Sequence, residues 1–360
     1  MHKDDLMTPV ERARALAKGE AVDRMPISMI YGAPAHALLG WTRIQEQESG
    51  RSMADVQKKV YEVFGGDGVS TRYGLHGMAV NYEAKMTNPD HQPQAILEPP
   101  IKDINDLSML DLDRFTVQND PTAKKCFDAV RILRDEIGNE VAASMMFSGA
   151  FTSASALVGA EHLMRALHKN PEQVHKLLEF TSQALQQMAK PFLEEGFGIS
   201  IADPVASGTM ITRKMFQKFV VPYSRSIVEY YEAIKPSPVF CHVCGDTTKV
   251  LDDLVDCGYK ILSLDNVVDM AVAKEKVGDK VCLVGNVDPV GVIYLGTPED
   301  VKAAVRECCE KTWDSPKGYM IATGCDSAYG TPMENSLAFM EEARKCSKFP
   351  LNPENFKADA

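Results

Sequence analysis

Three residues with metal-binding chemistry end two short apolar runs of this sequence. His242 and Cys244 lie two positions apart at the end of 238–244, and Cys325 ends the run 318–325. Side chains two positions apart on a strand point to the same side. One imidazole and two thiolates are good Zn²⁺ ligands, and three protein ligands leave a fourth position for water or substrate. From the residues alone, a catalytic zinc site and a chance His-x-Cys in a packed core both remain open.

Other polar residues stand at the ends of neighbouring apolar runs. Asp203 either orients a substrate or caps a backbone turn, and Asn286 either contacts a substrate or satisfies its own loop. Asp265 is a candidate fourth ligand, a partner that orients the ligand imidazole, or the N-cap of the next helix. Because a bound Zn²⁺ lowers the pKa of a coordinated thiol or water, a nucleophile near neutral pH is the expected chemistry.

Eight apolar segments must position these residues. Each is followed by polar residues, Gly or Pro, as expected of parallel strands buried on both faces. The segments are residues 25–32, 68–74, 141–147, 198–204, 238–244, 260–265, 280–287 and 318–325. Amphipathic stretches separate them, and one begins with Thr297 as N-cap and Pro298 at the first helical position.

Repeated strand–helix units predict an α/β fold, a (β/α)8 TIM barrel that forms one domain over residues 1–360. A doubly wound open sheet is the alternative, but no GxGxxG follows the first strand. Residues 76–118 carry turn signals and are predicted to be an N-terminal insertion or β-ribbon at one barrel end. In a barrel, active sites lie where strands end, so the polar residues above are expected around one mouth.

Composition excludes several classes of function. The chain is 45% hydrophobic and 25% charged, with a net charge of -11, which offers no basic face for nucleic acid. No apolar run reaches the roughly 20 residues of a membrane span, and the first residues contain no signal-peptide segment. The nine cysteines are therefore expected to be mostly free thiols of a cytoplasmic protein.

Longer motifs resemble the uroporphyrinogen decarboxylase superfamily, and more closely its zinc-dependent methylcobamide:coenzyme M methyltransferase branch. The resemblance covers residues 140–345 well and the N-terminal third loosely. It is carried by GAFTSASALVGAE, IADPVASGTMITRKMFQKFVVPY, HVCGDTT, LVGNVDPVGVIYLGTPEDV and TGCDSAYGTPMENSLAFM, with the opening RARALAKGEAVDRMPI.

This resemblance implies that His242, Cys244 and Cys325 bind zinc. The decarboxylases carry an arginine-rich stretch after the first strand, whereas residues 25–40 contain no arginine. Family members read Pro-Gly-Cys-Gly at the last ligand, whereas this chain reads TGCD at 323–326.

The segment after the second strand also departs from the family. There, His76 with Tyr73 and Tyr82 either forms a substrate pocket or packs a loop. Catalytic candidates outside the ligand set are therefore Asp203, His76 and Asn286.

The resemblance implies methyl transfer between cobalamin and a small thiol such as coenzyme M. The chain lacks the Asp-x-His-x-x-Gly signature of corrinoid-binding proteins, so the cobalamin is expected on a separate corrinoid protein. Alternatives are an O-demethylase that takes methyl from a methoxylated aromatic to cob(I)alamin, a decarboxylase-like enzyme, and a non-catalytic scaffold. Neither nucleic acid nor a membrane is an expected partner.

Overall fold

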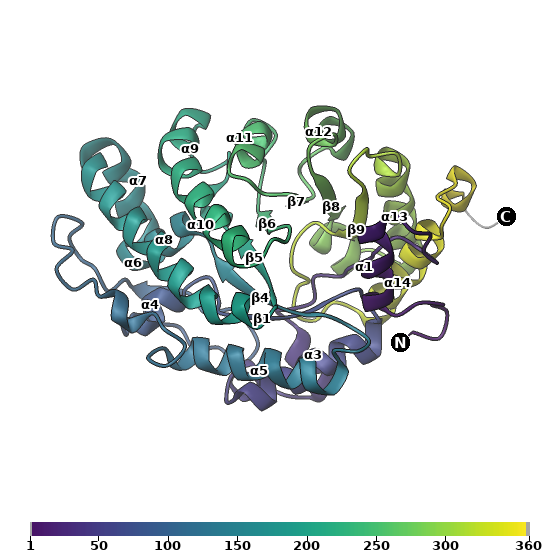
Figure 1. Cartoon of the computed structure of the whole chain (residues 1–360), viewed down its shortest axis with the longest axis horizontal. Coiled ribbons are helices and arrows are strands. Elements are labelled where there is room, and N and C mark those ends of the chain that lie inside the picture. The colour runs from purple at the N-terminus through teal and green to yellow at the C-terminus, as the bar shows by residue number, and fades with distance from the viewer. Residues whose placement is uncertain (1, 358–360) are drawn as a thin grey trace.

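Seven parallel strands pair side by side, in the order in which they occur along the chain (Figure 1). The computed structural model describes residues 2–357. The strands are β1 (Val69–Arg72), β4 (Ala143–Ser148), β5 (Gly198–Ala202), β6 (Phe240–Val243), β7 (Ile261–Leu264), β8 (Cys282–Val287) and β9 (Tyr319–Thr323). Six of them fall within the apolar segments predicted from the sequence and β4 extends one residue beyond its segment, which confirms the α/β architecture.

The eighth predicted strand, residues 25–32, closes the sheet without forming a regular strand. Ile27 makes an isolated parallel bridge to Ile321, and Ser28 N donates to the Ile321 carbonyl at 3.0 Å. On the other side, Asp67 N donates to the Ile27 carbonyl at 3.1 Å. The segment thus lies between β9 and β1, as a barrel requires. Pro26 lacks an N–H, which interrupts the hydrogen-bond ladder here.

Helices alternate with the strands along the chain and cover the outside of the sheet (Figure 1). They are α1 (Pro9–Lys18), α2 (Arg43–Glu46), α3 (Gly50–Phe64), α4 (Gly77–Asn81), α5 (Pro121–Ile137), α6 (Ala150–Val158), α7 (Ala160–Lys169), α8 (Pro171–Glu194), α9 (Arg213–Phe219), α10 (Val221–Ile234), α11 (Leu251–Asp256), α12 (Met270–Val277), α13 (Pro298–Thr312) and α14 (Met333–Ser347). Short helical turns are η1 (Ala35–Leu39), η2 (Leu112–Arg114), η3 (Pro204–Ala206), η4 (Pro289–Tyr294) and η5 (Pro353–Phe356).

Helix α13 begins as its sequence predicts. Thr297 accepts a hydrogen bond from Asp300 N while the Asp300 carboxylate accepts from Thr297 N, which forms a capping box, and Pro298 follows the cap. None of the helices in residues 2–357 is both long and apolar enough to cross a membrane.

The segment after β1 is irregular, as predicted. It contains α4 and a short antiparallel ribbon of β2 (Lys85–Met86) with β3 (Ile96–Glu98) before α5 begins. Because it leaves from the carboxyl end of β1, the ribbon starts at the end of the barrel where a site is expected.

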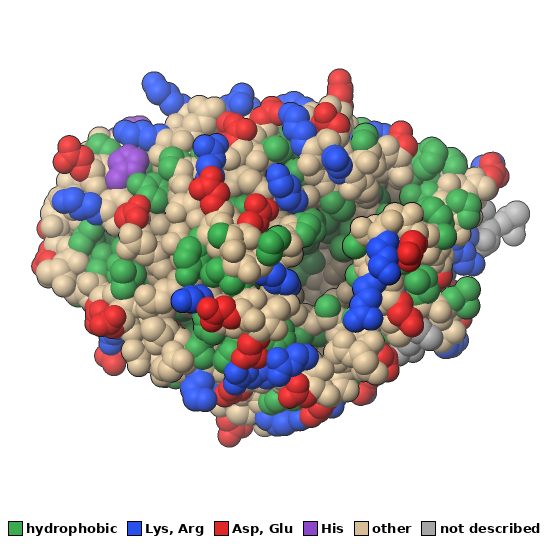
Figure 2. Space-filling model, viewed as in Figure 1, with side chains coloured by type: hydrophobic (Ala, Val, Ile, Leu, Met, Phe, Trp, Pro, Cys, Tyr) green, Lys and Arg blue, Asp and Glu red, His purple; other side chains and the backbone are tan. Residues whose placement is uncertain are grey.

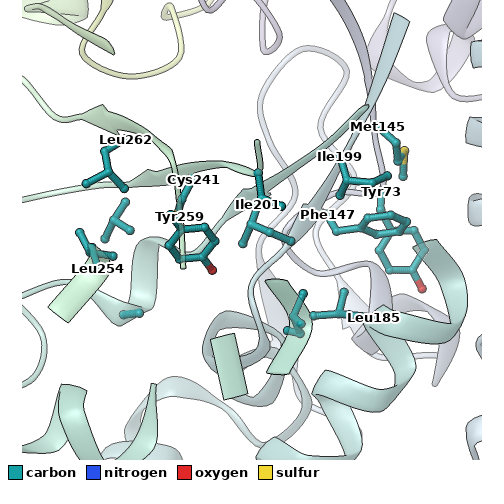
Figure 3. Close-up of a cluster of buried hydrophobic side chains, with 14 of the residues drawn as sticks. Tyr73, Met145, Phe147, Leu185, Ile199, Ile201, Cys241, Leu254, Tyr259 and Leu262 are labelled. Carbon is teal, nitrogen blue, oxygen red and sulfur yellow. The ribbon is translucent and has the colours of Figure 1, made fainter. Parts of the chain in front are cut away.

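Alternate side chains of the strands face the helices and form the core (Figure 3). Phe147 of β4 and Ile199 and Ile201 of β5 are buried, and Leu185 of α8 lies beside them. The residues between them on the strands face the barrel interior. Ala202 pairs with His242, and His242 pairs with Ser263 on β7, so this interior layer carries His242.

A buried charged cluster fastens the amino ends of the strands. Arg12 is fully buried, and its guanidinium contacts Asp23 and Asp67. The other oxygen of Asp67 lies 2.6 Å from Arg24 Nη1 and accepts Ile27 N at 2.8 Å. Asp67 therefore ties the first extended segment to the start of β1.

Candidate metal centre

His242 and Cys244 stand at the carboxyl end of β6, on the same side of the strand. The chain then turns at Gly245, whose φ is +76°. A Cβ at this position would lie 2.7 Å from Ser207 Oγ and 2.8 Å from Thr209 Oγ1, so only glycine fits the turn. This sharp turn leaves Cys244 at the mouth of the barrel.

Cys325 reaches the same place from the end of β9. Cys244 Sγ lies 3.2 Å from His242 Nε2 and 3.6 Å from Cys325 Sγ. All three ligand atoms lie within 4.8 Å of one another. The structure thus brings together the three residues predicted as metal ligands.

These separations fit a Zn²⁺ ion. Tetrahedral bonds of about 2.3 Å to sulfur and about 2.0 Å to nitrogen would place two sulfurs about 3.8 Å apart and sulfur about 3.5 Å from nitrogen. The contacts between Cys244 and its two neighbours differ from these spacings by a few tenths of an ångström. One imidazole and two thiolates leave one coordination position open, which is the composition of a catalytic rather than a structural site.

The two thiols differ in acidity. The hydrogen bond from Cys244, assisted by His242, lowers the pKa of Cys325 to about 5 despite burial. The pKa of Cys244 is raised, because its proton is shared with Cys325 and because the thiol is partly buried. The lowered pKa of Cys325 favours its thiolate, which is the form that binds a metal.

Ser263 orients the imidazole of His242. Its Oγ lies 3.0 Å from His242 Nδ1, and its side chain is 1% exposed. With Nδ1 engaged there, Nε2 is the nitrogen that faces the sulfur of Cys244. Sequence reasoning missed Ser263, although its position two before Asp265 places it on the interior face of β7.

Asp265 supports the turn after Cys244, and its role as a fourth ligand or as a partner of the imidazole stays a prediction. Its Oδ2 accepts Gly245 N at 2.7 Å, and Oδ1 accepts Val267 N at 3.3 Å. Asn286 donates its side-chain amide to the carbonyls of Asp265 (2.9 Å) and Val268 (2.7 Å). Both amide hydrogens are thus engaged in holding the Asp265 loop, and the catalytic role predicted for Asn286 stays a prediction.

Asp203 caps a neighbouring helix. Its Oδ1 accepts hydrogen bonds from Thr152 N (2.8 Å) and Thr152 Oγ1 (2.5 Å), in the first turn of α6. Its backbone N–H donates to the His242 carbonyl at 2.9 Å. The side chain is 2% exposed, its Oδ2 has no hydrogen-bond partner, and burial raises its pKa to about 6. The capping interpretation describes this geometry, and a catalytic role for Asp203 stays a prediction.

The residues around His76 pack the segment after β1. Tyr73 is 3% exposed and donates its hydroxyl to Asp120, and the Tyr82 hydroxyl accepts Asp111 N at 2.8 Å. Both tyrosines therefore act in loop packing. His76 precedes α4, burial lowers its pKa, and its Nδ1 is buried with no partner. Its catalytic role also stays a prediction.

Sequence reasoning missed an ion pair beside the last ligand. Asp326, the residue after Cys325, binds Arg72 of β1 with 2.6 Å between Oδ2 and Nη1. The only sequence signal was the acidic residue that directly follows a ligand cysteine. The partner, Arg72, lies hundreds of positions away in the chain.

Comparison with known proteins agrees with the predicted resemblance. A family model described as uroporphyrinogen decarboxylase (URO-D) matches residues 8–346. The methylcobamide:CoM methyltransferase MtaA of Methanosarcina barkeri is 27% identical, over 91% of this chain and 95% of the relative. A methylated-thiol–coenzyme M methyltransferase of Methanosarcina mazei is 24% identical, over 96% and 90%.

Two further comparisons concern the wider family and the fold. A uroporphyrinogen decarboxylase of a Synechococcus species is 24% identical, over 91% of this chain and 94% of the relative. A solved methyltransferase structure from Methanosarcina mazei superposes with a TM-score of 0.81 at 24% identity, over 94% of this chain and 98% of that one. The superposition confirms the barrel fold.

Proposed function

This chain belongs to the uroporphyrinogen decarboxylase (URO-D) family, and on that premise we propose that it is a zinc-dependent methyltransferase of a corrinoid system. It would move a methyl group between protein-bound cobalamin and a small thiol. The observation that carries the proposal is the convergence of His242, Cys244 and Cys325 at the barrel mouth. Relatives named as methylcobamide:CoM methyltransferases support the choice of reaction.

The residues of the site have distinct tasks in this proposal. Zn²⁺, when bound by the three ligands, would supply a Lewis acid that makes a coordinated thiol nucleophilic near neutral pH. Ser263 fixes the imidazole ring, and Asp265 fixes the turn after Cys244. Because these hydrogen bonds orient the ligand residues before a substrate arrives, little reorganisation of the site would be needed.

The namesake decarboxylation fits this chain poorly. A substrate with several carboxylates needs cations to pair with them, and residues 25–40, which follow and include the first strand segment, contain no arginine. The backbone amides of Gly32 and Ala33, in that same region, are already engaged with Asp326. These features support the methyltransferase branch over the decarboxylases.

A corrinoid protein is the proposed partner, and exposed apolar side chains near the mouth support a docking surface for it. They lie in the loops after β7 and β8 and at the start of α14: Val267, Val290, Tyr294, Leu295, Met333 and Leu337. The Asn335 amide binds the carbonyls of Ile293 and Gly296, which joins two of these elements. Clustered exposed apolar side chains are typical of protein–protein contacts. The space-filling view shows the opposite face, where α1 lies at the amino ends of the strands and charged side chains surround a hollow right of centre (Figure 2).

The test combines metal content with methyl transfer. We expect about one Zn²⁺ per chain. We also expect methylation of a small thiol by methylcobalamin, which is measured by the absorbance change of the cobalamin. Cys325→Ala should lose or loosen the metal and abolish the reaction. Cys282→Ala is the matched control, because the hydrogen bond of this half-buried thiol among the described residues goes to the Leu283 carbonyl, away from the ligand set.

The outcomes separate the alternatives. A protein that stays metal-free after refolding with zinc would refute the methyltransferase assignment. A zinc protein that leaves thiols unmethylated but demethylates a methoxylated aromatic in the presence of cob(I)alamin would reverse the direction of transfer. A zinc protein that does neither and only binds the corrinoid protein would be a scaffold.

A further inference from the structure

Three hydrogen-bond donors converge on one carboxylate beside Cys325. Asp326 Oδ1 accepts Gly32 N at 2.7 Å, and Oδ2 accepts Ala33 N at 3.0 Å. The guanidinium of Arg72 completes the set, with Nη1 2.6 Å from Oδ2. We call Gly32, Ala33 and Arg72 the anion cradle. Two adjacent amides and a guanidinium are the donors with which proteins bind carboxylates, sulfonates and phosphates.

The backbone beside the anion cradle is shaped to accept the guanidinium of Arg72. The guanidinium of Arg72 lies flat against Gly32, where a Cβ would come within 1.7 Å of Arg72 Cζ. Only glycine therefore allows the guanidinium to reach the carboxylate that the two amides bind. Arg72 Nε is buried without a hydrogen-bond partner, so the side chain has donor capacity that Asp326 does not use. Asp326 and Arg72 each keep 28% of their side-chain surface exposed, so the cradle opens toward solvent.

The cradle also lies next to the candidate zinc site. Asp326 directly follows the ligand Cys325, and the charge of Arg72 interacts with that of Cys325. A small thiol bound at the open metal position would carry its far end into this neighbourhood. An anionic end would find its hydrogen-bond donors in the cradle, but the carboxylate of Asp326 already occupies these donors.

We propose that Asp326 fills the anion cradle and thereby restricts the substrate to small thiols without an anionic end. The inference rests on the proposed function and narrows its substrate class. A carboxylate attached to the same chain has a high effective concentration, so a free anion at millimolar concentration competes poorly with it. The negative charge of Asp326 also repels an anionic substrate from the rest of the site.

A matched pair of thiols tests the proposal. The two are 2-mercaptoethanesulfonate, which is coenzyme M, and 2-mercaptoethanol, which carries a hydroxyl in place of the sulfonate. Calorimetric titration of the zinc-loaded protein gives a dissociation constant for each. We expect the wild type to bind the sulfonate no more tightly than the neutral thiol. In Asp326→Asn, preference for the sulfonate should rise by about tenfold or more, as expected for a new charge-assisted hydrogen bond.

Two further variants keep the test decisive. Asp326→Gly removes the carboxylate from the cradle entirely and should show the same gain in preference for the sulfonate. It replaces Asp326→Asn as the test if that variant folds poorly. Adding Arg72→Met to either variant should remove the gain while affinity for the neutral thiol stays unchanged. Asp246→Asn, which removes an exposed carboxylate that caps Thr248 in the loop after Cys244, controls for net charge and should leave the preference unchanged.

Ethanesulfonate, which has no thiol, separates this inference from the proposed function. Binding of ethanesulfonate to the Asp326 variants but not to the wild type supports the filled cradle, even if no thiol binds anywhere. A wild type that already prefers the sulfonate tenfold would overturn the inference. So would zinc-loaded Asp326 variants whose preference is unchanged.

Discussion

Replacing Ser263 with alanine should weaken zinc binding while leaving the barrel folded. Ser263 Oγ lies 3.0 Å from His242 Nδ1, at a position that is 1% exposed. When Nε2 binds the metal, Nδ1 carries the proton and donates it to this hydroxyl. In Ser263→Ala that N–H stays buried with no acceptor, which costs about 1–3 kcal/mol.

The cost applies mainly to the metal-bound state, because without metal the ring can change tautomer or rotate. One to three kcal/mol corresponds to a zinc dissociation constant about 5–150 times larger, which spans the roughly 10–100-fold effect typical of residues that orient metal ligands. Competition with a chelating metal indicator measures that constant directly. Ser200→Ala is the matched control, since Ser200 is a strand serine whose hydroxyl contacts only the Met145 carbonyl, at 3.5 Å, among the described residues.

Equal zinc affinity in Ser263→Ala and the wild type would refute the assignment of Nε2 as the metal-binding atom. A loss of equal size in Ser200→Ala would show that the effect comes from general loosening of the barrel interior. Thermal unfolding of the metal-free proteins separates these cases, because only a structural defect lowers the midpoint without zinc.

Three other predictions concern stability. Asp67→Asn should destabilise the protein by about 3–5 kcal/mol in urea unfolding, because Arg12 and Arg24 would stay buried without the carboxylate that they share. A loss of stability below about 1 kcal/mol would contradict the role given to this charged cluster. Folding raises the pKa of Asp203 from 3.8 to about 6, so folding favours the protonated form, and stability should fall by about 3 kcal/mol as the pH rises through that interval. In Asp203→Asn the stability should no longer fall across this pH interval. If the difference in unfolding free energy between variant and wild type were the same at every pH, the prediction would be refuted. Gly245→Ala should destabilise the fold and weaken zinc binding. Gly74→Ala, with a similar φ but nothing within 4 Å of the added Cβ, should cost only the backbone strain of about 1–2 kcal/mol. Equal zinc affinity in the two variants would show that the turn after Cys244 does not position Cys244.

Local sequence pattern was sufficient for the strands and for two of the ligands. Buried parallel strands appear as short apolar runs because both faces are covered, and their polar ends therefore stand out. His242 and Cys244 share one strand end, so the two-residue period alone places them together. The first strand was harder to define, because Pro26 breaks its ladder although Ile27 still pairs with Ile321.

The conformation of the loop after each strand separates two residues that look alike in the sequence. Asp203 directly follows β5, Asp265 directly follows β7, and both were candidates for the site. In the structure Asp265 holds the turn after Cys244, whereas Asp203 faces α6 and caps it. The side to which a residue turns after a strand ends depends on the loop conformation, which no periodicity describes.

The sequence by itself determined the fold class, the strand ends and the candidate ligand set, because these depend on burial patterns and residue chemistry that are local to each segment. Only the tertiary structure decided that Cys325 lies 3.6 Å from Cys244 although the two are 81 positions apart, that Ser263 orients His242, and that Asp326 binds Arg72. Those contacts arise where the curvature and register of a closed sheet bring distant strand ends together, and that closure is a property of all the strands at once.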